Sequence, residues 1–89
     1  MKHFNIQVIG EVQGVYYRAL AREKADELGV KGFVRNEPDG SVYLEAEGDP
    51  NTLEKLVTWC RQGPPRAKVE NVITKEAADK GFKRFEIIR

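Results

Sequence analysis

Apolar and polar residues alternate over the first ten residues, and the pattern then changes to a helical repeat. Every second residue from Phe4 to Val8 is apolar, which is typical of a strand with one buried face, so we expect a strand over residues 3–10. Over residues 16–28 the apolar positions recur every three or four residues, which predicts a helix with one buried side. Gly29 then follows as a helix stop.

The middle of the chain has the pattern of a hairpin followed by a second helix. Strands are expected over residues 30–36 and 41–47, and the turn between them, Glu37-Pro38-Asp39-Gly40, has proline and glycine at positions that β-turns favour. Two strands joined by so short a turn predict an antiparallel hairpin. Asp49-Pro50 has the composition of a helix start, and apolar residues at helical spacing continue to about Gln62.

The last third of the chain contributes two more strands. We expect them over residues 67–76 and 82–88, with a polar connector at 77–81. The resulting order, β-α-β-β-α-β with an additional short C-terminal strand, predicts an α+β fold. This is a ferredoxin-like sandwich, with two helices on one face of a mostly antiparallel sheet. In that topology the first two strands run parallel, so the loop after the first strand and Asn36 at the end of the second lie at the same edge.

Composition narrows the function classes. Fifteen basic and fourteen acidic residues leave a net charge of +1, so there is no overall electrostatic attraction to nucleic acid or to anionic membranes. The single cysteine, Cys60, continues the apolar side of the second helix, and we expect it in the core rather than as a reactive thiol. With 89 residues, the chain has the length of a single domain, residues 1–89. No apolar run is long enough for a signal peptide or a membrane span, so we expect this domain to act in the cytoplasm.

The stretch from Gly10 to Arg18 is the strongest candidate for chemistry. Its two glycines, Gly10 and Gly14, allow a sharp bend and a close approach of the backbone to a ligand. The first turn of a helix has free N–H groups and a positive dipole end, so a cation such as Arg18 is unfavourable there unless an anion lies between them. This pattern favours a phosphate site. Ordinary turn glycines beside a solvated arginine stay open as the alternative, because neither a complete P-loop nor a dinucleotide-binding motif is present.

Asn36 is the second polar candidate at that edge. Its amide can orient a water molecule but is too weak a base to deprotonate it, so such a site suits a substrate with a good leaving group. An asparagine before a turn also commonly caps its own backbone, and that alternative stays open as well. The remaining candidates are weaker, since we expect His3 at a strand edge and Glu45 and Glu47 on a solvated face.

Two motifs resemble those of the acylphosphatase family. Gly10-Glu11-Val12-Gln13-Gly14-Val15-Tyr16-Tyr17-Arg18 is similar to the family signature G-x-V-Q-G-V-x-[FY]-R. Gly32-Phe33-Val34-Arg35-Asn36, followed by Asp39-Gly40-Ser41-Val42, is similar to its second signature. The resemblance covers nearly the whole chain. It departs at Phe33, where the family often has tryptophan, and at Glu37, where it often has threonine and where this chain places a carboxylate beside the expected anion site.

The resemblance implies the same ferredoxin-like sandwich and an enzyme that hydrolyses acyl phosphates to a carboxylate and inorganic phosphate, without a metal or cofactor. Carried over by position, Arg18 would bind the phosphate and Asn36 would orient the attacking water. The phosphate cradle would be formed by the loop and helix-start residues Gln13, Gly14, Val15, Tyr16, Tyr17 and Arg18. From the apolar pattern we expect Tyr17 also to reach the core and Tyr16 to stay near the loop.

The implied partners are small molecules. They are an acyl phosphate substrate, with inorganic phosphate as product and competitor, and we expect a monomer that binds neither nucleic acid nor membrane. One alternative is a non-catalytic module of the same fold that binds a phosphorylated metabolite. Another is an RNA-recognition domain, which Lys31-Gly32-Phe33-Val34 resembles only faintly and without the repeated aromatic residues.

Overall fold

Five strands and two helices make up the computed structural model, which describes residues 1–89. The elements follow in the order β1 (Lys2–Glu11), α1 (Tyr17–Leu28), β2 (Lys31–Asn36), β3 (Val42–Gly48), α2 (Pro50–Gln62), β4 (Lys68–Ala77) and β5 (Phe85–Ile88). Every expected element is present, and only the last strand is clearly shorter than expected. Neither helix has the length and apolar character that crossing a membrane requires.

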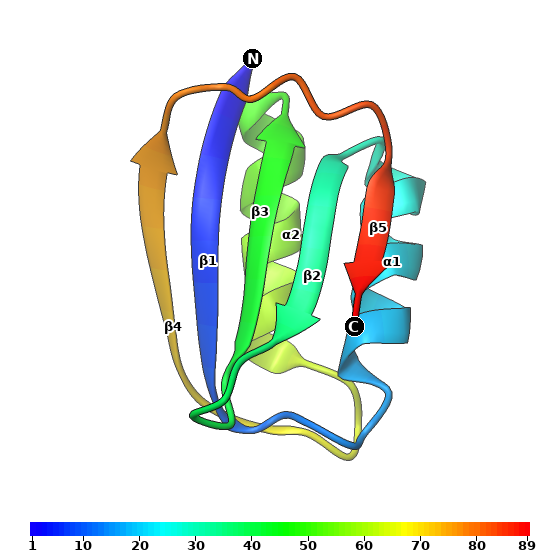
Figure 1. Ribbon diagram of the computed structural model, residues 1–89, viewed down its shortest axis with the longest axis vertical. Coiled ribbons are helices and arrows are strands. Elements are labelled where there is room, and N and C mark those ends of the chain that lie inside the picture. Colours follow the sequence, from blue (N-terminus) through cyan, green and yellow to red (C-terminus); the bar gives the residue numbers. More distant parts are fainter.

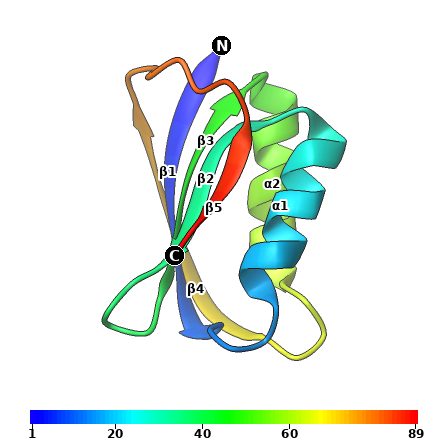
Figure 2. The same cartoon turned by 45° about the vertical axis from the view of Figure 1, so that its right-hand side comes forward.

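The strands form one sheet in the order β4-β1-β3-β2-β5 (Figure 1). β1 pairs with β3 and β4, and β2 pairs with β3, all antiparallel, whereas β5 runs parallel to β2 at the edge. Both helices cover the same face of the sheet (Figure 2). The predicted ferredoxin-like α+β sandwich with an extra C-terminal strand is therefore confirmed. Because β1 and β2 both run antiparallel to β3, they are parallel to each other, and their C-terminal ends meet at the lower edge in Figure 1.

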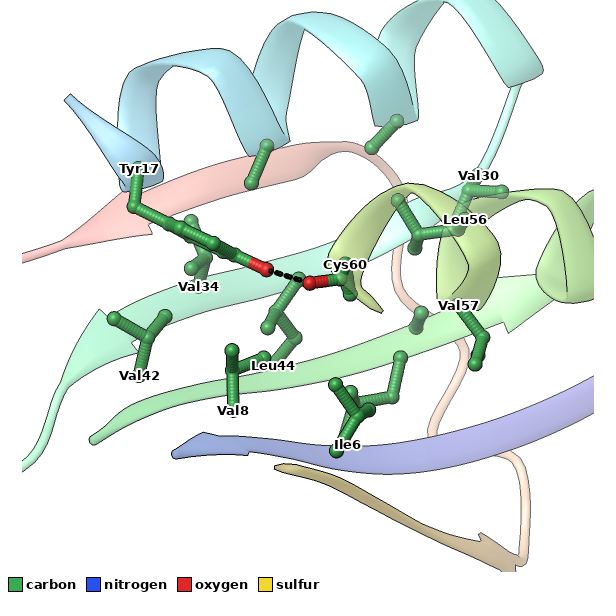
Figure 3. Packing of buried hydrophobic residues seen from close by; sticks show 14 of the residues in the cluster. Ile6, Val8, Tyr17, Val30, Val34, Val42, Leu44, Leu56, Val57 and Cys60 are labelled. Atoms are coloured by element: carbon green, nitrogen blue, oxygen red, sulfur yellow. Dashed lines mark hydrogen bonds between the residues drawn. The ribbon is translucent and has the colours of Figure 1, made fainter. Parts of the chain in front are cut away.

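The core lies between the helices and the sheet (Figure 3). Tyr17, at the start of α1, donates a hydrogen bond from its hydroxyl to the backbone carbonyl of Cys60 at 2.9 Å, which ties α1 to α2. Cys60 is fully buried, as predicted, and burial raises the pKa of its thiol to about 12. The anchored Tyr17 also confirms the expected split between the two tyrosines, since Tyr16 beside it is exposed. The first turn of α1, which carries Arg18, is thus fixed from within the core.

The last strand begins later than expected, because the backbone of the preceding residues binds a side chain of β3. The backbone N–H groups of Lys80, Gly81 and Phe82 donate to the carboxylate of Glu47, with Gly81 at 3.1 Å and Phe82 at 2.9 Å. Successive N–H groups that converge on one anion cannot also pair in a strand ladder. This connector crosses from β4 at one edge of the sheet to β5 at the other (Figure 1).

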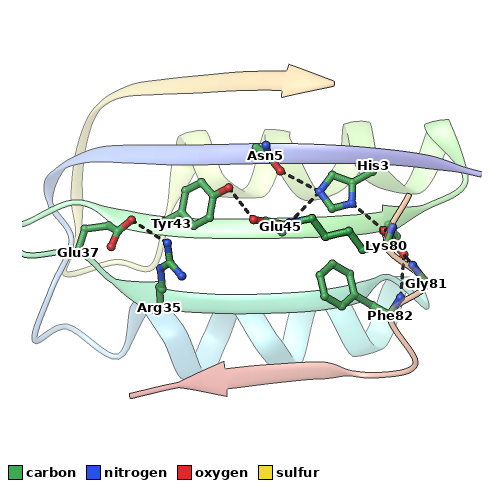
Figure 4. Close-up of polar contacts among 10 residues, drawn as sticks. His3, Asn5, Arg35, Glu37, Tyr43, Glu45, Lys80, Gly81 and Phe82 are labelled. Carbon is green, nitrogen blue, oxygen red and sulfur yellow. Dashed lines mark hydrogen bonds and ion pairs between the residues drawn. The ribbon is translucent and has the colours of Figure 1, made fainter. Parts of the chain in front are cut away.

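His3, Glu45 and Glu47 form a buried cluster, so their expected places at a strand edge and on a solvated face are wrong. Figure 4 shows His3 and Glu45 of this cluster. His3 is fully buried, with Nδ1 2.7 Å from Glu47 Oε2 and Nε2 3.2 Å from Glu45 Oε1. The reason is topological. β1 and β3 lie inside the sheet, and the connector places Phe82 over the face that the helices leave open, with its ring centroid 5.9 Å from that of His3.

Acid is expected to weaken the fold through Glu47. Burial by itself raises the pKa of this carboxyl, but the backbone N–H donors and His3 outweigh it and hold the net pKa below its ordinary value. Because the folded pKa is lowered, the stabilisation is present above the unfolded pKa of about 4.3 and is lost as the pH falls through the folded value. In thermal melts, the gap in melting temperature between wild type and Glu47→Gln should be widest near neutral pH and should narrow in acid.

The matched control for this experiment is Glu54→Gln, since Glu54 is exposed on α2. Its melting temperature should differ little from that of wild type across the same pH range. A gap for Glu47→Gln that stays constant from neutral pH into acid would contradict the assignment of acid sensitivity to this carboxylate.

Candidate active site

The loop between β1 and α1 starts at a close contact between two strands. Gly10 still belongs to β1, with φ of +139°, and a Cβ at this position would lie 2.1 Å from the carbonyl oxygen of Lys68. The pairing of β1 with β4 shifts register between Ile9 and Gly10. The expectation that Gly10 admits a ligand is therefore wrong, because the close approach is made by the backbone of β4. Gly14, with φ of +73° and open space around it, is the glycine that permits the bend.

Replacing Gly10 with alanine is expected to destabilise the protein by roughly 2–4 kcal/mol, since the new methyl group overlaps a backbone oxygen and the conformation is strained for any other residue. Gly14→Ala is the control, because it meets no neighbouring atom and loses only about 1–2 kcal/mol from its left-handed backbone. Denaturant unfolding of both variants measures the difference. Equal losses at the two positions would show that the strand contact is not the constraint at Gly10.

Gln13 braces the loop against the turn between β2 and β3. Its Nε2 donates to the backbone carbonyls of Glu37 and Ser41, both at 2.8 Å. The side chain therefore does not line the cavity beside α1, and Val15 packs against the core instead. These two members of the expected cradle have only their backbone groups to offer a ligand. The brace also ties the loop to the strand end that carries Asn36.

A cavity of about 480 Å³ opens between the loop, the first turn of α1 and the end of β5. Nine residues line it: Val12, Gly14, Tyr16, Tyr17, Arg18, Ala19, Asn36, Ile87 and Arg89. Arg18 and Asn36, which are far apart in the sequence, meet here because β1 and β2 run parallel. Gly14, Tyr16 and Tyr17 of the expected cradle lie in the same wall, whereas Gln13 and Val15 do not.

The N-terminus of α1 opens toward this cavity without a cap. Tyr16 occupies the cap position in the left-handed conformation, with φ of 61°, and is the one residue other than glycine with a positive φ. No side chain caps the helix, and its first turn holds no acidic residue. The first N–H groups of a helix have no partner within it, so they and the positive dipole end are available to an anion. Holding an aromatic residue in this conformation costs about 1–3 kcal/mol, and such strain is concentrated at ligand sites.

Arg18 lies against β5. Its Nη1 donates to the backbone carbonyl of Ile88 at 3.3 Å, and the other donors of the guanidinium remain for a ligand. Ile87 of this strand and Arg89, which directly follows it, also line the cavity, and both were missed from the sequence. Their contribution depends on the parallel pairing of β5 with β2 beside α1, which the alternation of residues 82–88 does not indicate.

Asn36 makes no hydrogen bond through its side chain to another residue of the protein, so the turn-capping alternative does not hold. Asp39 has that task, since its Oδ1 accepts the backbone N–H of Ser41 at 2.9 Å and its hydroxyl at 2.6 Å. These bonds hold the pKa of Asp39 below its ordinary value. The amide of Asn36 is therefore unengaged at the cavity wall.

Glu37 does not line the cavity, although its carboxylate was expected beside the anion site. Its Oε1 lies 3.4 Å from Nη2 of Arg35, on the face of the sheet opposite the helices (Figure 4). The guanidinium of Arg35 also lies over the rings of Phe33 and Tyr43, at 5.5 and 4.9 Å from their centroids. Both departures from the family pattern, Phe33 and Glu37, thus contact the same arginine outside the cavity.

The arrangement is suited to binding an anion with several oxygens. Two guanidinium groups, of Arg18 and Arg89, and the N-terminus of α1 supply positive charge and donors, while no carboxylate side chain lines the cavity. A planar guanidinium can hold two oxygens of a phosphoryl group at once. Asn36, at the end of β2, lines the same cavity and can orient a small polar molecule through its carbonyl and its amino group.

Several known proteins are similar to this chain in sequence and in structure. A family model described as Acylphosphatase matches residues 4–87. The chain is 50% identical over 90 residues to an acylphosphatase from Methylococcus capsulatus, covering 100% of the chain and 98% of that protein. The structure resembles the crystal structure of acylphosphatase from Bacillus subtilis, with a TM-score of 0.97, 36% identity and 100% coverage of both chains. It resembles an acylphosphatase from Coxiella burnetii with a TM-score of 0.95 and 36% identity, covering 98% of this chain and 92% of that one.

Proposed function

The chain belongs to the acylphosphatase family, and from that premise we propose that the cavity beside α1 is where it hydrolyses acyl phosphates. The oxygen of a water molecule attacks phosphorus, and the bond between phosphorus and the carboxyl oxygen breaks. The electron pair of that bond leaves with the carboxylate, so the products are a carboxylate and inorganic phosphate. The observation that supports this best is the pairing, in one cavity, of an arginine and an unengaged asparagine amide beside an uncapped helix start.

Arg18 is the residue proposed to hold the phosphoryl group. Its guanidinium stays protonated at any relevant pH and offers paired donors to two phosphoryl oxygens. The backbone N–H groups of the loop from Gln13 to Tyr17 and of the first turn of α1 complete the cradle. These donors stand in place before the reaction, so they stabilise the charge on the equatorial oxygens of a loose transition state without having to reorganise.

Asn36 is proposed to place the attacking water. An amide can accept one hydrogen bond from water and donate another, which fixes the direction of the attacking lone pair, but it cannot remove the proton. A carboxylate is a good leaving group, so no strong general acid is required. We assign the water proton to an oxygen of the substrate's own phosphoryl group, which lies next to the attacking oxygen in this arrangement.

The proposal extends to the form in which the enzyme acts. Residues 1–89 would form a single acylphosphatase-like domain that works as a monomer in the cytoplasm. Its substrate would be a small acyl phosphate, with inorganic phosphate as product and competitor and with neither nucleic acid nor membrane as a partner. The near-neutral net charge of the chain supports the absence of a nucleic-acid partner.

The test is a hydrolysis assay with benzoyl phosphate in the presence of a metal chelator, with inorganic phosphate added as a competitor. We expect turnover that the chelator leaves unchanged and that phosphate inhibits competitively, since both ligands use the same cradle. Binding of phosphate without any turnover of benzoyl phosphate or acetyl phosphate would instead support a non-catalytic binding module of the same fold.

A further inference from the structure

A second hollow continues the cavity along α1 and β5. It has a volume of about 250 Å³ and is lined by Arg22, Arg84, Phe85, Glu86, Ile87 and Arg89. Ile87 and Arg89 also line the cavity that holds Arg18 and Asn36, so the two hollows share part of their wall. We call this second hollow the α1–β5 groove. A substrate whose phosphoryl group lies at Arg18 therefore has a path along which its acyl chain can extend.

Positive charge gathers in the α1–β5 groove, although the chain as a whole carries a net charge of only +1. Three of its six lining residues are arginines, against one glutamate, Glu86. Neither Arg84 nor Arg89 takes part in any ion pair of the protein. Arg22 has one partner, Asp26, at 3.8 Å, with both side chains more than half exposed, and a pair of this kind contributes little. All three guanidinium groups are therefore available to an anion.

The spacing of the arginines follows the groove away from the phosphate cradle. Arg22 lies four residues after Arg18 on the same side of α1, about 6 Å farther along the helix axis. Arg84 precedes β5 and Arg89 follows it, so they stand at the two ends of the strand that forms the other wall. A displacement of one helical turn is comparable to the length of a short acyl chain.

We propose that the α1–β5 groove is a subsite for a negative charge on the acyl group, so that the enzyme prefers acyl phosphates whose acyl chain ends in a carboxylate. This inference rests on the proposed function, because it takes the phosphoryl group to be held at Arg18. Arg22 and Arg84 act on the distal carboxylate and not on the reacting atoms. Glu86 opposes them, which limits the gain that one extra charge can bring.

Two substrates with four-carbon acyl groups test the subsite. Succinyl phosphate carries the distal carboxylate, and butyryl phosphate has the same number of carbon atoms without it. We expect wild type to show a higher kcat/KM for succinyl phosphate. In the Arg22→Gln/Arg84→Gln double variant, the ratio of kcat/KM for succinyl phosphate to kcat/KM for butyryl phosphate should fall about fivefold, because two exposed charge interactions with the distal carboxylate are lost. Hydrolysis of butyryl phosphate should stay unchanged. Raising the salt concentration should also lower the ratio of kcat/KM for succinyl phosphate to kcat/KM for butyryl phosphate in wild type, because salt screens the charge interaction.

Two further variants complete the experiment: one with the opposite expected effect, and one control at a position outside the groove. Glu86→Gln should raise the ratio of kcat/KM for succinyl phosphate to that for butyryl phosphate about twofold, because it removes the one acidic side chain of the groove. Lys55→Gln, which removes a charge from the exposed surface of α2, should leave it unchanged. Hydrolysis of both substrates with a ratio that none of these variants alters would overturn the subsite and leave the proposed function standing. Failure to hydrolyse either substrate would contradict the proposed function itself.

Discussion

The Arg18→Ala variant is expected to lose nearly all hydrolysis of benzoyl phosphate while its fold survives. Removing the guanidinium takes away the main side-chain donors that face the phosphoryl oxygens, and the loss in kcat/KM should be about 10³-fold or more. Within the protein the side chain makes one hydrogen bond, at 3.3 Å to the carbonyl of Ile88, so its removal costs the fold little. Steady-state kinetics and a thermal melt of the same preparation measure the two effects separately.

Arg18→Lys distinguishes the shape of this cation from its charge. A lysine keeps the positive charge but offers a single point of attachment in place of a planar fork, so it cannot hold two phosphoryl oxygens in a fixed orientation. We expect kcat/KM to stay at least about 100-fold below wild type. Arg61→Lys, at the exposed end of α2, is the matched control and should be fully active. Near-normal turnover by Arg18→Lys would contradict the two-point contact with the phosphoryl group.

Much of the fold could be predicted because its signals are local. Alternation from Phe4 to Val8 and the helical repeat over residues 16–28 are properties of neighbouring residues, and each gave an element close to its observed bounds. The meeting of Arg18 with Asn36 followed from one further step, the parallel course of β1 and β2 in this topology. The part of the site that depends on those two strands could therefore be predicted from the sequence.

What the sequence did not reveal depends on contacts between distant segments. Glu45 and Glu47 were expected on a solvated face, because nothing local indicates that the connector after β4 folds over that face and buries them. Gly10 gives the same lesson, since the missing side chain makes room for β4 and not for a ligand.

The side of the cavity formed by the end of β5 is the part of the candidate site that the sequence did not predict. Ile87 and Arg89 reach it because β5 pairs with β2 at the edge beside α1, and a four-residue strand carries too little pattern to predict its neighbour. An arginine at the end of a short strand has no local feature that marks it as part of a site. Only the pairing of the sheet reveals its place.

Asn36→Ala is expected to separate turnover from phosphate binding. If the amide acts on the water and not on the phosphoryl group, kcat should fall about 100-fold or more, while the inhibition constant of inorganic phosphate stays within about threefold of wild type. Since the side chain makes no hydrogen bond inside the protein, its truncation leaves no partner unsatisfied and the melting temperature should hardly change. Asn51→Ala, at an exposed position of α2, is the control for removal of an asparagine amide.

Asn36→Asp sharpens this test because it keeps the size of the side chain and changes its charge. A carboxylate at the wall of an anion cavity repels the phosphoryl oxygens, so this variant should lose phosphate affinity as well as turnover, in contrast to Asn36→Ala. That contrast holds only if residue 36 faces the bound phosphate closely enough to contact a water poised for attack. Loss of phosphate binding with intact turnover in Asn36→Ala would reverse the roles, making the asparagine part of the cradle and leaving the water to be placed by another group.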